Sequence, residues 1–310
     1  MKKFITLLTV FLLSLNTEAQ NISNSEAFDI ASKFMAKKGI TLVNDDKAST
    51  RGNVEPYSIF NGVDGRGFAI VVNGAIVGYS TENSADMNNI PPQLKGILES
   101  YSKTITRATT RGDYPIWYTP REVEPIAPLI TSKWNQSSPY NDMLDGKTGI
   151  CVTIANGQLL HYLGVKGCKE VNCVEHGIVL PETTFNHDLI KDSYNWKSSE
   201  ESKKEVAKFI YYLEHVFAGG KTDYQGALGV SAKHWTTRRW EAESFHDRFY
   251  ENGVRLIEGY IEDLYVFLDS LLGKKLPLIV GVSSKINSEG HFLLLDGRDS
   301  IGLYHLNWGW

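Results

Sequence analysis

The chain of 310 residues is long enough for two domains, and its 42% hydrophobic and 22% charged residues are ordinary for a globular protein. Its formal net charge of −4 provides no basic surface that would attract nucleic acid or an anionic membrane. Composition and charge therefore argue against nucleic-acid and membrane partners and favour small molecules or proteins.

Residues 1–19 have the features of a secretory signal peptide. Two lysines precede an apolar run from Phe4 to Leu15, and Thr17 and Ala19 supply small residues at positions −3 and −1 of a cut after Ala19. The apolar run is shorter than the roughly 20 residues that span a bilayer. We therefore expect a soluble mature protein that is secreted or periplasmic.

Residues from about 21 to 105 form one compositional unit. Small and apolar residues recur at helical spacing behind a cap at Ser23 or Asn24 and predict a helix that ends at Gly39. Three apolar runs follow, over residues 57–62, 67–74 and 75–81, and their Asn-Gly and Asp-Gly turns predict antiparallel strands. A second helix is predicted over residues 91–105, where it begins with proline. The expected product is a small α+β module.

A polar stretch, TRATTRGDYP, separates this module from the rest of the chain over residues 106–115. It is typical of an exposed linker that proteases can cut. Beyond it the pattern predicts helices over about 152–163, 202–217 and 256–272, then strands over 275–284, 290–297 and 303–308. A helical half followed by a β half predicts an α+β domain in which helices and sheet form separate layers.

The chain has three cysteines, Cys151, Cys168 and Cys173, an odd number that does not fit a disulfide scaffold. A zinc site built from Cys168, Cys173 and His176 fits no standard ligand spacing, and we expect neither a metal nor another cofactor. Cys151 opens a predicted helix, where the positive end of the helix dipole favours a thiolate. The alternative for Cys151 is a small buried hydrophobic residue.

His291 follows Gly290 at the start of an apolar strand, where many histidines are half-buried packing residues. It lies 140 residues after Cys151, within the roughly 130–150 residues that separate cysteine and histidine in papain-type enzymes. The two form a candidate thiolate–imidazolium dyad. Gln136 is a candidate donor to the oxyanion of the tetrahedral intermediate, together with the backbone N–H of Cys151. The alternative for Gln136 is a loop glutamine that faces water.

Four sequence blocks, WNQSSPYN, CVTIANGQ, GHFLLLDG and YHLNWGW, occur in this order. They resemble the streptopain family of papain-like cysteine proteases. The nucleophile signature of the family is matched at Cys151, Val152, Gln158 and Tyr162. The histidine block is matched over residues 290–297, and the terminal Asn-Trp-Gly-Trp over residues 307–310.

The resemblance implies roles for individual residues. Cys151 is expected to be the nucleophile, His291 its base and Gln136 the side chain of the oxyanion hole. The histidine-supporting residues are expected to be Asn307, Trp308 and Trp310, with packing by tryptophan favoured over a papain-like amide. The remaining histidines are expected to be structural or solvated: His161, His176, His187, His215, His234, His246 and His305.

The resemblance also implies the domain organisation. Residues 20–109 are expected to be an inhibitory prodomain, and residues 110–310 a papain-like catalytic domain with a helical half and an antiparallel sheet half. The family continues past its Trp-Gly-Trp with a Gly-rich loop and a last strand, so we expect the catalytic domain to lack its last C-terminal segment.

The expected activity is that of a secreted zymogen of a cysteine endopeptidase, which hydrolyses protein or peptide substrates through a thioester and is inhibited by its own prodomain. Departures from the family pattern include Ile150 before the nucleophile and Thr153, Ile154, Asn156 and Gly157 after it. Two alternatives stay open: a catalytically impaired binding protein on the protease fold, and an acyl transferase or amidase that uses the same dyad.

Overall fold

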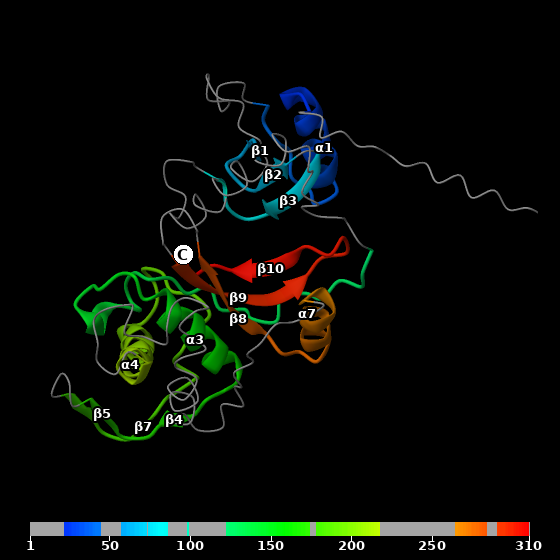
Figure 1. The fold of residues 1–310 in the computed structure, drawn as a ribbon. Helices are drawn as coiled ribbons and strands as arrows, with labels where there is room; N and C mark the ends of the chain where they lie inside the picture. The colour runs from blue at the N-terminus through cyan, green and yellow to red at the C-terminus, as the bar shows by residue number, and fades with distance from the viewer. Residues whose placement is uncertain are drawn as a thin grey trace, which may run out of the picture. The chain divides into compact units, whose positions relative to one another are not determined.

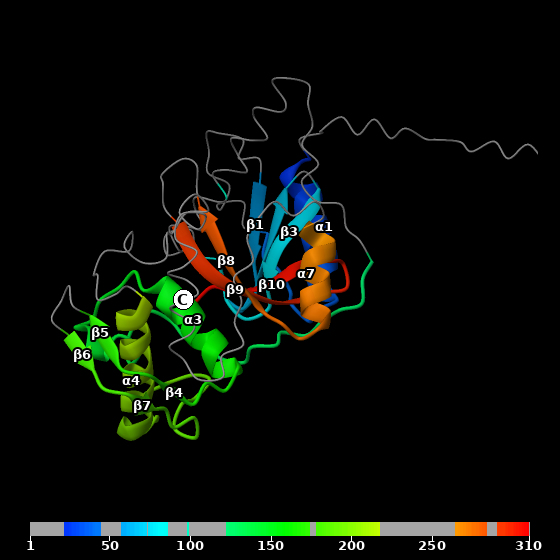
Figure 2. The ribbon, with the colours of Figure 1, turned by 60° about the horizontal axis from the view of Figure 1, so that its bottom comes forward.

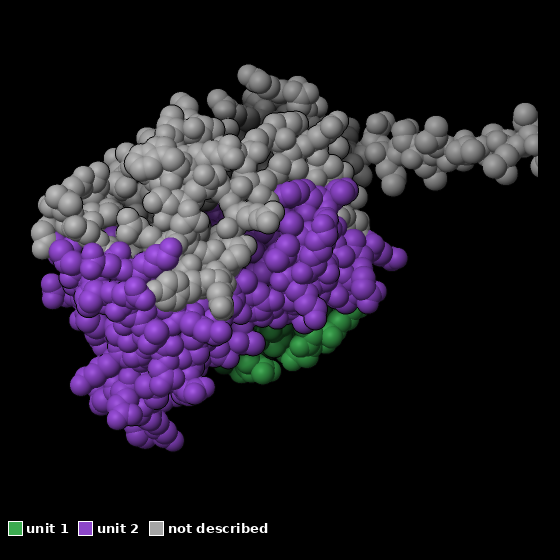
Figure 3. Space-filling model, turned by 90° about the horizontal axis from the view of Figure 1, so that it is seen from below, with its two compact units in different colours: residues 1–89, 98–119 green, residues 90–97, 120–310 purple. Residues whose placement is uncertain are grey.

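The computed structural model describes residues 22–44, 57–72, 74–85, 98, 122–173, 178–217, 264–283 and 290–309. The chain divides into two compact units, residues 1–89 with 98–119 and residues 90–97 with 120–310, which are coloured separately in Figure 3. The predicted signal peptide, the linker and Trp310 lie outside the described residues. In the part of the chain that the structure describes, no helix is both long enough and apolar enough to cross a bilayer.

Unit 1 begins with helix α1 (Asn24–Ala36). Its N-cap is Ser23, whose hydroxyl accepts from Glu26 N at 3.2 Å while the Glu26 carboxylate accepts from Ser23 N at 2.9 Å. This capping box selects Ser23 over the neighbouring asparagine as the cap. The helix ends three residues before the predicted Gly39, because the backbone beyond Ala36 forms i→i−3 bonds and an i→i−5 bond from Ile40 N to Met35 O in place of helical ones.

The strands of unit 1 are β1 (Tyr57–Asn61), β2 (Phe68–Val72) and β3 (Ala75–Ser80), which form an antiparallel sheet in the order β1-β2-β3. Helix α1 lies beside this sheet (Figure 1), and the rings of Phe28 and Phe60 pack edge to face with their centroids 5.3 Å apart. The predicted helix and three strands are thus confirmed. The second predicted helix lies outside the described residues except for Leu98, which is helical and buried.

The helical half of unit 2 contains a short 3₁₀ turn η1 (Asp142–Leu144) and helices α3 (Cys151–Tyr162) and α4 (Glu200–Phe217). Residues 151–160 of α3 are all buried, so this helix is surrounded on every side. Gly157 permits the close approach of α4, because a Cβ there would lie 2.9 Å from Ile210 Cδ1 and 3.2 Å from the Trp134 ring. The departure at Gly157 therefore has a packing cause.

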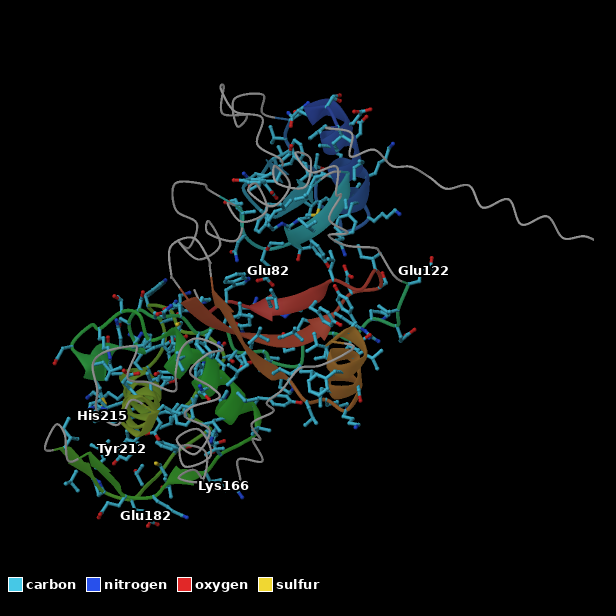
Figure 4. All side chains as sticks on the ribbon, viewed as in Figure 1. Glu82, Glu122, Lys166, Glu182, Tyr212 and His215 are labelled. Carbon is cyan, nitrogen blue, oxygen red and sulfur yellow. The ribbon has the colours of Figure 1, made fainter. Side chains whose placement is uncertain are left out.

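Two small two-stranded sheets complete the helical half, and the sequence did not predict them. Strand β4 (Gly167–Cys168) pairs with β7 (Thr183–Thr184), and β5 (Val171–Cys173) pairs with β6 (Ile178–Leu180). Figure 2 shows them beside α4. Tyr212 of α4 donates its hydroxyl hydrogen to Pro181 O at 2.9 Å, which ties the helix to the segment before β7 (Figure 4).

The β half contains helix α7 (Leu264–Gly273) and strands β8 (Leu278–Ser283), β9 (Gly290–Arg298) and β10 (Tyr304–Asn307). The strands form an antiparallel sheet in the order β10-β9-β8. Central strand β9 is buried: Phe292 and Leu294 pack in the core shared with α3, and Leu295 packs with α7. The predicted strands are confirmed, and the predicted start of α7 near residue 256 lies outside the described residues.

Residues 122–136, here called the crossing segment, run from the sheet into the helical half. Ile126 forms a β-bridge with Arg298 of β9, and Ile130 N donates to the fully buried carboxylate of Asp296 at 2.8 Å. The other oxygen of Asp296 lies 2.5 Å from His305 Nδ1 of β10. Farther along, the indole of Trp134 is buried against α3 and α4. The crossing segment is therefore fixed to both halves of unit 2.

Candidate active site

Cys151 is the first residue of α3, and its side chain is buried. Ile150 occupies the N-cap position and supplies no side-chain hydrogen bond to the first turn. The first N–H groups of the helix are therefore not consumed by a cap side chain, and the positive end of the helix dipole lies at the thiol. This placement favours negative charge on sulfur.

The turn before Cys151 is anchored to α4. The Glu214 carboxylate accepts a hydrogen bond from Lys147 Nζ at 2.6 Å and another from the hydroxyl of Thr153. Lys147 precedes α3 and Thr153 lies in the first turn of α3, so the buried Glu214 carboxylate is hydrogen-bonded to residues on both sides of Cys151. Sequence reasoning noted Thr153 as a departure from the family pattern but did not predict this contact.

His291 lies on β9 and is 1% exposed. Its Nε2 is 2.7 Å from the backbone carbonyl of Trp308, and its ring stacks on the Trp308 indole with centroids 5.5 Å apart. Because a carbonyl oxygen can only accept, Nε2 carries the hydrogen and the basic lone pair of the neutral ring is on Nδ1. Burial lowers the pKa of His291, and the hydrogen bond to Trp308 opposes this shift.

The elements that carry these two side chains are packed together. Helix α3 contacts β9, and Cys151 belongs to the same hydrophobic cluster as Phe292, the neighbour of His291. The terminal segment passes against the first turn of α3, since a Cβ on Gly309 would lie 3.2 Å from Ile154 Cγ2. Helix α3, strand β9 and the segment around Gly309 thus meet in one region of unit 2.

Gln136 is 5% exposed, so it is not the water-facing glutamine of the alternative. Its backbone carbonyl accepts from Asn141 Nδ2 at 3.1 Å, and the same amide donates to Lys147 O at 3.2 Å. Asn141 therefore links the loop of Gln136 to the turn before Cys151. Among the described residues, Gln136 Oε1 has no hydrogen-bond partner, which is unusual for a buried amide oxygen.

Asn307 takes part in a buried network that sequence reasoning missed. Gln158 Oε1 of α3 accepts hydrogen bonds from Ser132 Oγ at 3.1 Å, Trp134 N at 3.2 Å and Asn307 Nδ2 at 3.0 Å. Asn307 Nδ2 also donates to Ser132 O at 2.8 Å. Asn307 Oδ1 also accepts from Gly309 N at 3.3 Å, while Trp308 contacts His291. Trp310 lies outside the described residues.

The other described histidines contact groups outside this region. His161 and His187 stack with centroids 5.1 Å apart and their Nδ1 atoms at 3.0 Å, and burial lowers the pKa of His161. His215 bonds to a carbonyl of its own helix, and His305 pairs with Asp296. The described residues contain no cluster of three or more histidine, cysteine, aspartate or glutamate side chains that could hold a metal ion.

Comparison with known families accounts for this arrangement. Residues 134–310 match the sequence model of the peptidase C10 family, and residues 19–105 match that of the Spi protease inhibitor. The chain belongs to the peptidase C10 family. It is therefore a cysteine peptidase zymogen with an inhibitory prodomain, and the predicted family, fold class and class of activity are confirmed.

The chain is also similar to two named proteases. Streptopain of Streptococcus pyogenes is 25% identical over an alignment of 339 positions. The match covers 93% of this chain and 82% of streptopain. The thiol protease/hemagglutinin PrtT of Porphyromonas gingivalis is 24% identical, and the match covers all of this chain and 40% of PrtT.

A solved structure has the same fold. It is a fragment of prointerpain A of Prevotella intermedia that carries a cysteine-to-alanine mutation. It matches with a TM-score of 0.61 at 23% identity, over 84% of this chain and 87% of that one. The chain described here thus has a papain-like protease domain preceded by an α+β prodomain.

Proposed function

We propose that the chain is an endopeptidase in which Cys151 is the nucleophile and His291 its base. The observation that carries the assignment is the hydrogen bond from His291 Nε2 to Trp308 O, because it leaves the basic lone pair on Nδ1. The position of Cys151 at the N-terminus of α3, which packs against β9, supports the same pairing. Papain-type cysteine–histidine pairs exist as thiolate and imidazolium.

The proposed reaction has two stages. The thiolate of Cys151 attacks the carbonyl carbon of the scissile bond, and the imidazolium of His291 gives its proton to the departing amine as the C–N bond breaks. Neutral His291 then takes a proton from water, whose oxygen attacks the thioester carbonyl. The C–S bond breaks, the carboxylic acid product leaves and loses its proton to solvent, and the ion pair is restored.

The oxyanion of both tetrahedral intermediates would be bound by Gln136 Nε2 and the backbone N–H of Cys151. Gln136 is buried, and Asn141 links its loop to the turn before the nucleophile. A preorganised amide is suited to this task because it needs no reorientation when charge develops. Loss of one such donor typically lowers the rate by about 10²–10³-fold.

A thiol-directed epoxide tests the proposed function. The activated full-length protein should be labelled with one equivalent of the epoxide at Cys151 and should lose peptidase activity in parallel. The matched internal control is Cys168, a buried thiol that donates to Lys169 O and should stay unlabelled. Activity that persists without labelling at Cys151 would refute the assignment. Mass analysis of the peptide products separates hydrolysis, which yields free carboxylates, from acyl transfer.

The proposal extends to export and activation. Residues 1–19 would direct secretion or transfer to the periplasm, residues 20–109 would inhibit the enzyme, and residues 110–310 would form the catalytic domain. The inhibitor match ends at residue 105 and the peptidase match begins at residue 134, which is compatible with these boundaries.

Activating cleavage is expected between Thr106 and Tyr114, because this polar, turn-rich stretch separates two compositional units. N-terminal sequencing of the active form would locate the cut. A mature protein that begins before Ile97 or after Trp134 would contradict the boundary. A start beyond Trp134 would also remove its backbone hydrogen bond to Gln158.

A further inference from the structure

We propose that Gln158 is a positioning residue. It fixes the positions of three parts of the chain relative to one another: the crossing segment that contains Gln136, helix α3, and the segment of Asn307 and Trp308. The inference rests on the proposed roles of Cys151, His291 and Gln136. Gln158 itself is fully buried and follows Cys151 by seven residues, so both lie on the same face of α3 two turns apart.

One oxygen atom of Gln158 joins three segments of the chain. Oε1 accepts from Trp134 N, two residues before Gln136, and from Asn307 Nδ2, one residue before Trp308. The third donor is the hydroxyl of Ser132 in the same crossing segment. The side chain of Gln158 therefore touches the segment of the proposed oxyanion donor and the segment that supports His291, while its backbone belongs to the helix of the nucleophile.

The orientation of both amides follows from their partners. Trp134 N can only donate, so the atom of Gln158 that faces it is the oxygen. Ser132 O can only accept, so the atom of Asn307 that faces it is the nitrogen. A further contact, from Gln158 Nε2 to Asn307 Oδ1 at 3.4 Å, completes a reciprocal amide pair. The network is thus consistent in donors and acceptors.

Removal of this acceptor should affect catalysis more than the fold. A methionine at position 158 fills similar space but leaves Trp134 N and the Ser132 hydroxyl without this acceptor. The crossing segment would then shift relative to α3, and misplacement of a catalytic group by about 1 Å can cost about 10²-fold in rate. Gln158 makes none of the proposed contacts with substrate, so the loss should fall on kcat more than on KM.

The experiment compares four variants of the full-length chain after activation, each checked for folding by thermal melting. Gln158→Met should lower kcat about 10²-fold, close to the loss of about 10²–10³-fold expected for Gln136→Ala. The matched control is Asn156→Leu, which changes an equally buried amide of α3 that bonds to Val152 O within its own helix. It should keep activity within threefold.

Gln158→Glu supplies a readout that a purely structural role would not give. Its protonated carboxyl offers one O–H donor toward Asn307 Oδ1 and one acceptor oxygen, as the amide does. Burial favours this neutral form. The activity of Gln158→Glu relative to wild type should therefore rise as the pH falls. If Gln158→Met does not fold, the inference is tested with Gln158→Glu.

Three outcomes would overturn the inference: Gln158→Met within threefold of wild type, an equal loss in Asn156→Leu, or an activity of Gln158→Glu that is well below wild type and does not rise as the pH falls. Failure of the proposed function is recognised separately, because the wild-type enzyme would then not be labelled by the epoxide at Cys151. Labelled wild type with fully active Gln158→Met would refute the positioning role alone.

Discussion

Replacement of Cys151 by alanine is expected to lower kcat/KM for a peptide substrate by about 10⁴-fold or more, because the reaction loses its nucleophile. The fold should persist. Cys151 is buried at the first position of α3, where alanine occupies the same space with loss of a single sulfur atom and is an excellent helix former. Peptide hydrolysis and the melting temperature should be measured together.

The matched control for this variant is Cys168→Ala. Cys168 is also buried, but it lies on β4, and its thiol donates to Lys169 O. It should lose some stability and keep its activity. Residual activity of Cys151→Ala above about a thousandth of wild type would contradict the assignment, since loss of a covalent nucleophile typically costs more.

Replacement of His291 by glutamine is expected to cost about 10⁴-fold in kcat/KM. The glutamine amide can still donate to Trp308 O, so the support from the terminal segment is preserved, but an amide is not a base at neutral pH. A second effect should accompany the loss. Alkylation of Cys151 by iodoacetamide should become slow at acidic pH, because the thiolate would no longer be paired with an imidazolium.

His305→Gln serves as the comparison for this variant. His305 lies on the same sheet and pairs with Asp296, away from the proposed dyad. It should retain activity within a few-fold and the alkylation profile of wild type. If His291→Gln keeps rapid alkylation at acidic pH, His291 is not the group that stabilises the thiolate.

The sequence predicted the long elements of this protein because their signals are local. Helices α3 and α4 and strands β8, β9 and β10 have apolar periodicity or turn residues within their own length. The strand pairs β4–β7 and β5–β6 were missed because strands of two or three residues are too short to show an alternating pattern.

The site was predictable in part. Order and spacing of motifs identified Cys151, His291 and Gln136 as candidates, but spacing contains no information about hydrogen-bond partners. The contact between Gln158 and Asn307 joins positions 149 residues apart, and the partner of His291 is a backbone carbonyl, which no side-chain pattern reveals. The sequence matched Gln158 to the nucleophile signature of the family but indicated no partner for its side chain.

The crossing segment also bears on how unit 2 unfolds. Ile130 N is bonded to the sheet half through Asp296, and four residues later Trp134 N is bonded to the helical half through Gln158. Separation of the two halves would leave the buried N–H groups of this segment without acceptors, and an unsatisfied buried donor costs free energy. The halves are therefore expected to lose structure in a single cooperative transition, and the amide hydrogens of Ile130 and Trp134 should exchange with solvent only through that global event.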